Sequence, residues 1–508
     1  MSIPLGELIL VNRKTTAGIS FAGLLLLATL PLACTTGPSE GDARSQSAQK
    51  LQADGKWLEA VSEYNRVLKN DPNNTEILYN RGAAYSEIGQ AEKAIEDLSE
   101  VIRRDPKHIL AYGKRGKLRT DLEQYTLAIQ DLDIAIRLDP EVASFYRLRG
   151  LALDRSGEHQ RALDEFTLAI KLDPQNSEIF FNRSNAYRNL EDLENSLKDL
   201  DEAIRISPTM AKAFLNRGAT YGLLDRNKEA LSDFDKSIEI DPQNSSYFRN
   251  RGISYTRLGE LQKAVEDFDQ AIRLDPDSTV AYVNRGDTFS NLGRHQEAIG
   301  SYSQAIRLDP TSPELYLLRG TSHSDIQEHQ RAIEDYSEAL RIQPELATAF
   351  VNRGNSHADM DNHTLAIQDF NQAINLNNQL SDAYNGRGST YMALNKIQQA
   401  LEDFSHAIYL DPSNAPAFSN RAGAMLVAGL PQQAIGDLDE AIRLVPERPS
   451  SYVNRAIAYT ALSKDQEAQK DIDKAIKLGI DKSEIEEIIK MVKLNRELGN
   501  PGERIELP

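Results

Sequence analysis

The chain has 508 residues, of which 40% are hydrophobic and 26% are charged, a composition typical of a folded protein. Its formal net charge of -18 argues against nucleic acid as a main partner, because phosphates are neutralised by basic surfaces, and it favours basic partners. The only cysteine is Cys34, which excludes an internal disulfide bond.

The N-terminal segment has the pattern of a secretory signal, with a basic pair, an apolar run over residues 17–32 and the small residue Ala33. The run from Leu30 to Cys34 resembles the lipobox of bacterial lipoproteins, although two of its residues depart from that pattern. The resemblance implies that residues 1–33 are a lipoprotein-type signal peptide and that Cys34 is lipidated. It also implies a lipid-anchored protein of the cell envelope, outside the cytoplasm, at the outer membrane if the cell has one. An uncleaved N-terminal anchor is the alternative.

After a flexible tether over residues 34–40, a period of 34 residues organises the chain as far as residue 482. A fixed period of this length is the signature of a repeat architecture. Thirteen repeats are expected over residues 41–482, and no insertion breaks their register, although Asn378 takes the place of one proline. The prolines that mark the period are Pro72, Pro106, Pro140, Pro174, Pro208, Pro242, Pro276, Pro310, Pro344, Pro412 and Pro446.

Each repeat is predicted to form two short helices. In residues 279–312, small and apolar residues recur at helical spacing on both sides of the turn at Gly293. Pro310 cannot continue the second helix, and it biases Asp309 away from helical angles. The sequence therefore predicts an all-α chain of helix-turn-helix repeats.

Small residues recur at two places in the repeat. Glycine in a helix costs about 1 kcal/mol, so its recurrence in the first helix implies close packing that offsets the cost. Alanine recurs in the second helix, followed four residues later by an aromatic residue or leucine. These series resemble the tetratricopeptide-repeat (TPR) family, which implies a right-handed superhelical solenoid that binds other proteins. The glycines are Gly82, Gly116, Gly150, Gly218, Gly252, Gly286, Gly320, Gly354 and Gly388.

Both ends of such a solenoid need covering. The first repeat carries polar residues where apolar ones are expected, and we interpret it as an N-terminal cap. Ile485, Ile488, Ile489 and Val492 form one apolar stripe. Residues 483–498 are therefore predicted to form a capping helix, and residues 499–508 a loose tail.

An arginine stands just before the glycine position in twelve consecutive repeats, where TPR proteins usually have leucine. A half-buried guanidinium needs an acceptor. A carboxylate in the second helix is available in every one of these repeats except the one that has Ser301. We hypothesise a ladder of arginine–carboxylate pairs, formed within repeats or between them. The arginines are Arg81, Arg115, Arg149, Arg183, Arg217, Arg251, Arg285, Arg319, Arg353, Arg387, Arg421 and Arg455.

Asparagine often precedes that arginine. In long TPR superhelices such as those of the O-linked N-acetylglucosamine transferases, asparagines at this place line the concave groove and hold an extended peptide. An amide suits this role because it offers both a donor and an acceptor to a peptide unit. Solvated asparagines without a ligand are the alternative. The peptide-binding candidates are Asn80, Asn182, Asn216, Asn250, Asn284, Asn352, Asn420 and Asn454.

The sequence shows no phosphate-binding loop, zinc-protease motif or nucleophile elbow, and its eight histidines mostly follow the repeat. We expect no catalytic residue, no metal site and no cofactor, and so no enzyme. Chaperone-binding TPRs clamp a terminal carboxylate with an arginine at the asparagine position of a third repeat. No repeat has an arginine there, so carboxylate-clamp chaperone binding is not expected.

The expected function is a non-catalytic scaffold at the cell envelope that binds partner proteins or extended peptides in the concave groove. A non-catalytic subunit of an envelope enzyme or of an assembly machine is the alternative. A co-purifying activity would favour the second.

Overall fold

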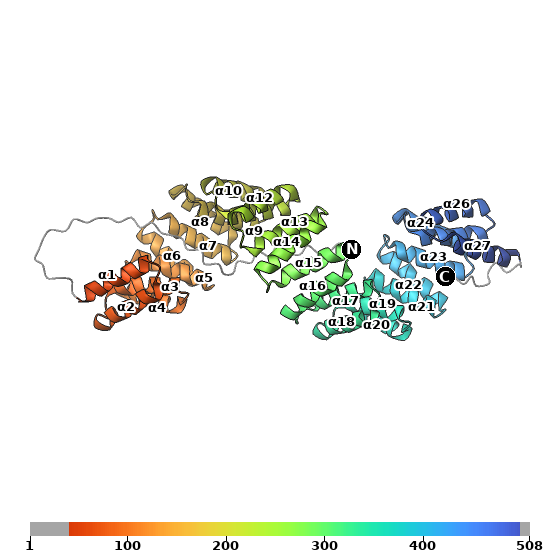
Figure 1. Ribbon diagram of the computed structural model, residues 1–508, viewed down its shortest axis with the longest axis horizontal. Helices are drawn as coiled ribbons and strands as arrows, with labels where there is room; N and C mark the ends of the chain where they lie inside the picture. Colours follow the sequence, from red (N-terminus) through yellow and green to blue (C-terminus); the bar gives the residue numbers. More distant parts are fainter. Residues whose placement is uncertain (1–39, 498–508) are drawn as a thin grey trace, which may run out of the picture. The chain divides into compact units, whose positions relative to one another are not determined.

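The computed structural model describes residues 40–497, and this part of the chain forms 27 α-helices and no strand (Figure 1). The expected all-α fold of paired helices is confirmed. The predicted signal peptide, the lipidation candidate Cys34, the tether and the C-terminal tail lie outside these residues. Among the described helices, none combines the length and apolar character that crossing a membrane requires.

The chain divides into two compact units, which we call the N-terminal half (to Glu260) and the C-terminal half (from Leu261). The helices of the N-terminal half are α1 (Glu40–Ala53), α2 (Trp57–Asn70), α3 (Thr75–Glu87), α4 (Ala91–Arg104), α5 (Ile109–Asp121), α6 (Tyr125–Leu138), α7 (Ala143–Arg155), α8 (His159–Leu172), α9 (Ser177–Asn189), α10 (Leu193–Ile206), α11 (Ala211–Leu223), α12 (Asn227–Ile240) and α13 (Ser245–Arg257).

The C-terminal half continues the same pattern. Its helices are α14 (Leu261–Leu274), α15 (Thr279–Asn291), α16 (His295–Leu308), α17 (Pro313–Asp325), α18 (His329–Ile342), α19 (Ala347–Asp359), α20 (His363–Leu376), α21 (Ser381–Ala393), α22 (Ile397–Leu410), α23 (Ala415–Val427), α24 (Pro431–Leu444), α25 (Pro449–Ala461), α26 (Asp465–Lys477) and α27 (Lys482–Glu497). Up to α26, odd-numbered helices are the first helices of their repeats, and even-numbered helices are the second.

A left-handed residue follows the first helix of each repeat and turns the chain toward the second. Glycine takes this place in some repeats, as at Gly293 with φ of 70°. Other repeats use a residue with a side chain, such as Glu123 or Gln327, at φ of 62° and 63°. The second helix ends before the repeat's proline, where Asp309 is extended at φ of -133°.

The recurrent glycine gives room to an aromatic ring of the second helix. A Cβ atom on Gly286 would lie 2.5 Å from the Tyr302 ring, which no real contact tolerates. At Gly82 the neighbours are Asp97 and Leu98 instead, whose nearest side-chain atoms would be 3.2 and 3.3 Å away. Alanine replaces the glycine in the last two repeats, where the packing partners are aliphatic, as for Ala422. The space is tightest opposite a ring, although a Cβ atom on Gly116 would also lie only 2.8 Å from Leu132.

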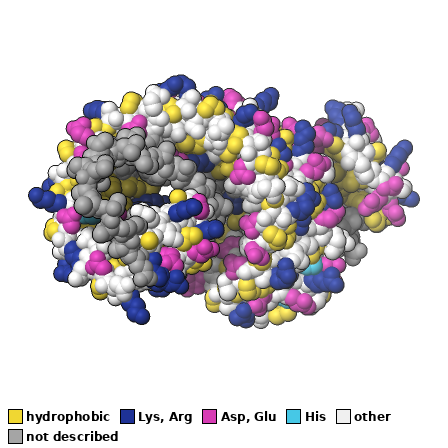
Figure 2. Space-filling model, turned by 60° about the vertical axis from the view of Figure 1, so that its left-hand side comes forward, with side chains coloured by type: hydrophobic (Ala, Val, Ile, Leu, Met, Phe, Trp, Pro, Cys, Tyr) yellow, Lys and Arg dark blue, Asp and Glu magenta, His cyan; other side chains and the backbone are white. Residues whose placement is uncertain are grey.

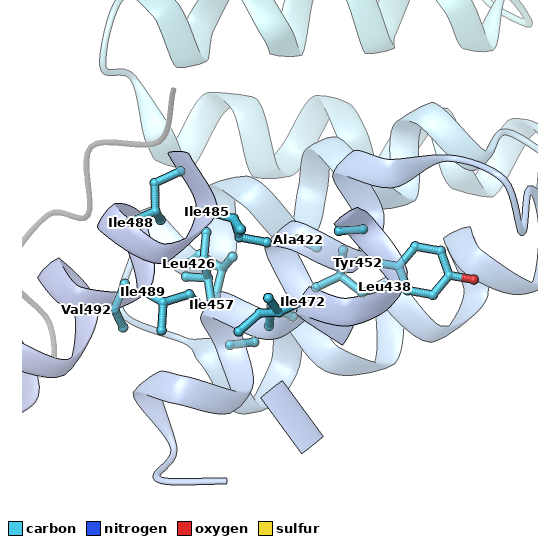
Figure 3. Close-up of a cluster of buried hydrophobic side chains, with 14 of the residues drawn as sticks. Ala422, Leu426, Leu438, Tyr452, Ile457, Ile472, Ile485, Ile488, Ile489 and Val492 are labelled. Carbon is cyan, nitrogen blue, oxygen red and sulfur yellow. The ribbon is translucent and has the colours of Figure 1, made fainter. Parts of the chain in front are cut away.

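The last helix, α27, closes the core of the C-terminal half. The predicted stripe of Ile485, Ile488, Ile489 and Val492 is buried among side chains of the last two repeats, including Ile457 (Figure 3). The helix packs against α25, the first helix of the last repeat. Unlike the first helix of a further repeat, α27 packs mainly against the first helix α25 rather than against the second helix α26.

The arginine ladder is present, and it is more extensive than predicted. Arg183 donates from Nε and Nη2 to both carboxylate oxygens of Asp199, at 2.7 Å each, sixteen residues ahead in the same repeat. Its Nη1 donates to Thr167 Oγ1 at 3.1 Å, sixteen residues back in the preceding repeat. Each such arginine therefore joins three helices of two repeats, and we call this arrangement an arginine staple. The pairing is both within repeats and between them.

The staple recurs along both halves. Asp97 accepts from Arg81 in the same way, and this hydrogen bond raises the pKa of the arginine. Arg285 departs from the pattern as the sequence predicts, because it meets Ser301 Oγ at 3.1 Å and keeps its carboxylate bond to Asp269 of the preceding repeat at 2.6 Å. The other residues bonded in the preceding repeat are Asn65, Ser99, Asp133, Asp201, Asp235, Ser303, Ser337, Asn371, Ser405 and Asp439.

The outward surfaces of the second helices carry ion pairs of a different kind. Glu338 and Arg341 pair at 2.6 Å across one helical turn, and Glu440 and Arg443 pair at 2.5 Å. These exposed pairs contribute little to stability. On the face shown in Figure 2, acidic and basic side chains are interspersed, with hydrophobic ones between them.

Candidate functional site

The first helices have two faces with different roles. Their third, fourth, eighth and tenth residues are mostly buried against second helices, as Ile179, Phe180, Ser184 and Ala186 are in α9. First helices of neighbouring repeats also contact one another, for example α5 with α7 and α21 with α23. Their opposite side therefore forms a continuous surface within each half. We call it the groove face and define it as residues two, five, six, nine, twelve and thirteen of α3–α13 and α15–α25.

A recess of about 390 Å³ lies on the groove face at the C-terminal end of the chain. First helices α21, α23 and α25 form it together with α27, so the capping helix both covers the core and walls the recess. The lining residues are Ser389, Met392, Phe404, Ser419, Asn420, Gly423, Ser450, Val453, Asn454, Ile480, Glu484, Ile485 and Ile488.

Two of the predicted peptide-binding asparagines meet in this recess. Asn420 donates from Nδ2 to Asn385 Oδ1 at 3.0 Å and to Ser389 Oγ at 3.2 Å, which leaves its Oδ1 available. The amide of Asn454 makes no hydrogen bond with any residue that the structure describes. The recess thus offers an acceptor and a complete amide above a mostly apolar floor.

The unbroken series from Asn182 to Asn284 is placed differently. Asn182, Asn216 and Asn250 are buried, with 8%, 5% and 4% of their surface exposed. Asn216 donates to Asn185 Oδ1 and Asn250 donates to the Ser246 carbonyl, both at 2.7 Å. Local contacts therefore occupy part of the bonding capacity of Asn216 and Asn250, and peptide binding by this series stays a prediction.

The remaining candidates are spread along the groove face. Asn80 and Asn352 are half-buried and make no hydrogen bond within the described part of the chain. Nδ2 of Asn284 is buried and has no partner there either. The structure therefore brings together only Asn420 and Asn454 in a defined recess.

The charge of the groove face differs between the halves. The C-terminal half has no lysine or arginine at groove-face positions, where its charged residues are Asp287, Glu314, Asp325, Asp359 and Asp382. Asp287 accepts from the Tyr302 hydroxyl at 2.7 Å, and burial raises the pKa of this carboxyl. The groove-face cations of the N-terminal half are Lys114, Lys117, Arg147, Arg155, Arg188, Lys212, Arg249 and Arg257.

Two of the histidines lie against carboxylates of their own repeats. His323 is buried, and its Nδ1 lies 2.7 Å from Glu328 Oε2, while His159 Nδ1 lies 2.7 Å from Asp154 Oδ1. Within residues 40–497 no three histidine, cysteine or carboxylate side chains gather as metal ligands would.

Sequence reasoning missed two features of this surface. The wall that α27 gives to the recess depends on where the capping helix docks, which the periodic pattern does not encode. The groove-face cations were hidden among the many charged residues. A comparison of positions five, six and twelve from repeat to repeat would have shown that Lys114, Arg147 and Arg188 stand where the other repeats have uncharged residues, except at Arg249 and Asp154.

Family models described as tetratricopeptide repeat match residues 63–96, 114–177, 177–210, 211–244, 249–313, 317–386 and 381–414, which together make up more than half of the chain. No curated protein matches the chain.

Among solved structures, the Cut9–Hcn1 heterotetramer of the APC/C is similar at 16% identity and a TM-score of 0.43, over 83% of this chain and 96% of that one. Yeast Tom70 is similar at 17% identity and a TM-score of 0.35, over 80% and 97%. YrrB, described as a TPR protein with an unusual peptide-binding site, is similar at 24% identity and a TM-score of 0.33, over 36% and 95%.

Proposed function

Because the chain belongs to the tetratricopeptide-repeat family, we propose that it is a non-catalytic scaffold that binds extended segments of partner proteins on its groove face. The repeats support protein–protein interaction as the general role. The observation that carries the finer proposal is the recess between α21, α23, α25 and α27.

The recess suits one side chain and the backbone around it. Its volume of about 390 Å³ lies within the range of small-ligand pockets. Met392, Val453 and Ile488 offer apolar contacts, while Asn420 and Asn454 offer an acceptor and an amide to a peptide unit. An extended segment with an apolar side chain pointing inward would use both.

The chemistry of the lining favours binding over catalysis. No histidine, cysteine or lysine lines the recess, and Glu484 is its single charged residue. A serine there has no adjacent base to activate it. Glu484 is exposed at the edge, so a neutral or basic segment is favoured over an acidic one.

Site-specific crosslinking tests this proposal. A photoreactive phenylalanine analogue at Val453, in the recess, is expected to capture a partner protein in the cells that make the chain. The same analogue at Gln433, exposed on the second helix α24, serves as the matched control. Adding Asn420→Ala and Asn454→Ala should reduce capture from Val453 about 30-fold, because the two truncations together remove hydrogen bonds of about 2 kcal/mol. Equal capture at both positions, or capture that ignores the asparagines, would contradict the proposal.

We also propose that the scaffold is held at the cell envelope by a lipid on Cys34. The support is the N-terminal signal pattern and the position of the only cysteine at its end. Mass spectrometry of the mature N-terminus gives the test. A diacylglyceryl cysteine as the first residue is expected, whereas an intact residue 1 would mean an uncleaved anchor.

A further inference from the structure

Three groove-face cations of the N-terminal half have no carboxylate partner. Lys114 on α5, Arg147 on α7 and Arg188 on α9 belong to consecutive first helices that contact one another. Neither Lys114 nor Arg147 makes a hydrogen bond or an ion pair with any residue between 40 and 497. Arg188 makes one weak bond, from Nη2 to Asn185 Oδ1 at 3.3 Å, and its buried Nη1 has no partner there.

Glu87 acts on Lys114 from a distance without forming an ion pair, whereas the carboxylates near Arg147 and Arg188 are engaged with other groups. Glu178 accepts two hydrogen bonds from Lys212 Nζ, at 2.7 and 2.8 Å. Asp154 accepts from Asn189 Nδ2 at 3.1 Å and lies 2.7 Å from His159 Nδ1. The carboxylates closest to Arg147 and Arg188 are therefore bonded to other residues and do not pair with these arginines.

Burial makes the unpaired charges unfavourable in the free protein. It lowers the pKa of Lys114, Arg147 and Arg188, and nearby carboxylates raise it less. In the staple arginines the carboxylates outweigh burial. The pKa of Arg183, for example, is raised, because the hydrogen bonds and the charge of Asp199 more than offset the effect of burial. Three half-buried cations on one surface, each disfavoured when alone, would be stabilised by an anionic ligand.

We propose that the groove face of α5, α7 and α9 binds an acidic extended segment of a partner protein through Lys114, Arg147 and Arg188. This inference rests on the scaffold function and names the chemistry of one partner segment. Its site is distinct from the C-terminal recess, whose only charged residue is acidic.

The spacing of the helices defines the segment. Neighbouring helix axes lie about 10 Å apart, so α5 and α9 are separated by about 20 Å. One terminal carboxylate cannot meet cations spread over that distance. An extended chain advances about 3.3 Å per residue and presents alternate side chains to one face. Two or three Asp or Glu side chains within about seven residues would therefore reach all three cations.

Peptide binding to the full chain tests the site. The probe is a fluorescent peptide of about twelve residues, which spans about 40 Å when extended, with glutamate at alternate positions and both ends blocked. The control peptide has glutamine in place of each glutamate. The full chain is expected to bind the glutamate peptide about 30-fold more tightly than the glutamine peptide, and less tightly as salt is raised.

A matched pair of triple variants locates the site. Lys114→Met, Arg147→Met and Arg188→Met together should weaken binding of the glutamate peptide about 30-fold. The control replaces Lys117, Arg155 and Arg205 with methionine, which removes the same charge from cations already paired with Asp121 and Glu202. It should weaken binding less than about 3-fold, because screened and paired charges contribute little.

The outcomes separate this inference from the scaffold proposal. No preference for glutamate over glutamine, or equal losses in the two triple variants, would overturn the acidic-segment site and leave crosslinking at the recess unaffected. Stronger binding of a single-stranded DNA oligonucleotide that depends on the same three cations would also overturn it, in favour of a nucleic acid. The comparison of the two peptides on the unmodified chain holds even if a variant fails to fold.

Discussion

The two halves of the molecule share one framework and differ in what they place on it. Both are built from the same helix pairs, held by the same staples, as Arg183 and Arg353 show with their carboxylates at 2.7 to 2.8 Å. Their groove faces diverge, because lysine and arginine occur there only in the N-terminal half. The staple arginines and the groove-face cations thus lie on different sides of one helix, as Arg183 and Arg188 do on α9. The charge of the groove face can therefore differ between the halves while the staples are kept.

The difference in charge predicts that the two halves bind segments of different composition. The cations on α5, α7 and α9 favour acidic side chains, whereas the recess beside α27 offers amides, apolar contacts and one carboxylate, Glu484. The net charge of -18 conceals this contrast, since it averages over all surfaces. A partner that engages both regions would need two segments of different composition.

The largest expected effect tests whether the two sides of one helix are independent. Arg183→Met should reduce the free energy of unfolding by about 3 kcal/mol, because it leaves the buried Asp199 unpaired. Arg188→Met, five residues further along α9, should cause no loss, because burial already disfavours its charge. Urea denaturation and hydrogen exchange of α9 and α10 give the measurement. Similar losses of unfolding free energy in both variants would show that the two sides of the helix are not independent.

The second test asks whether the recurrent glycine is needed more opposite an aromatic ring than opposite a leucine. Gly286→Ala should destabilise the C-terminal half by about 2 kcal/mol, because the new Cβ would meet the Tyr302 ring at 2.5 Å. Gly82→Ala faces Leu98 at 3.3 Å and should be close to neutral. Thermal denaturation is the measurement. Combining Gly286→Ala with Tyr302→Leu should restore part of the loss, and a neutral Gly286→Ala would refute this requirement.

The third test moves the cations from one half to the other. In the background of the triple methionine variant, Asn284→Lys, Leu317→Arg and Ala358→Arg place cations at the equivalent positions of α15, α17 and α19. The glutamate peptide should regain an affinity within about 10-fold of the original, a difference of about 1.4 kcal/mol. Fluorescence anisotropy gives the affinity. Absence of any gain would mean that the three positions alone do not define the site.

The smallest expected effect concerns the turns. Gln327 adopts φ of 63° without being glycine, a conformation that strains a side-chain-bearing residue. Gln327→Gly should therefore stabilise the C-terminal half by about 0.5 kcal/mol, and Glu123→Gly should do the same in the N-terminal half. Alanine at either position keeps the strain and serves as the control. A stabilisation in one half only would show that the turns are not equivalent.

The sequence predicted what is periodic, and the structure supplied what is not. The helix pairs, the capping stripe from Ile485 to Val492 and the Arg–carboxylate pairs follow from residue types that recur at fixed spacing. The second partner of each staple could not be predicted, because that position varies among residues as different as Thr167 and Asp201. The sequence also could not predict that Arg147 is unpaired, because this depends on Glu178 accepting hydrogen bonds from Lys212 instead.

The sixteen-residue spacing between each staple arginine and its partners limits how the number and length of the repeats can change. Every staple reaches sixteen residues forward and sixteen residues back, so its partners belong to its own repeat and the preceding one. Duplication or deletion of a whole 34-residue repeat would leave every remaining arginine with an equivalent pair of partners. Insertion or deletion of a single residue between an arginine and one of its partners would instead break that sixteen-residue spacing. The number of repeats is therefore free to vary during evolution, while their length is fixed.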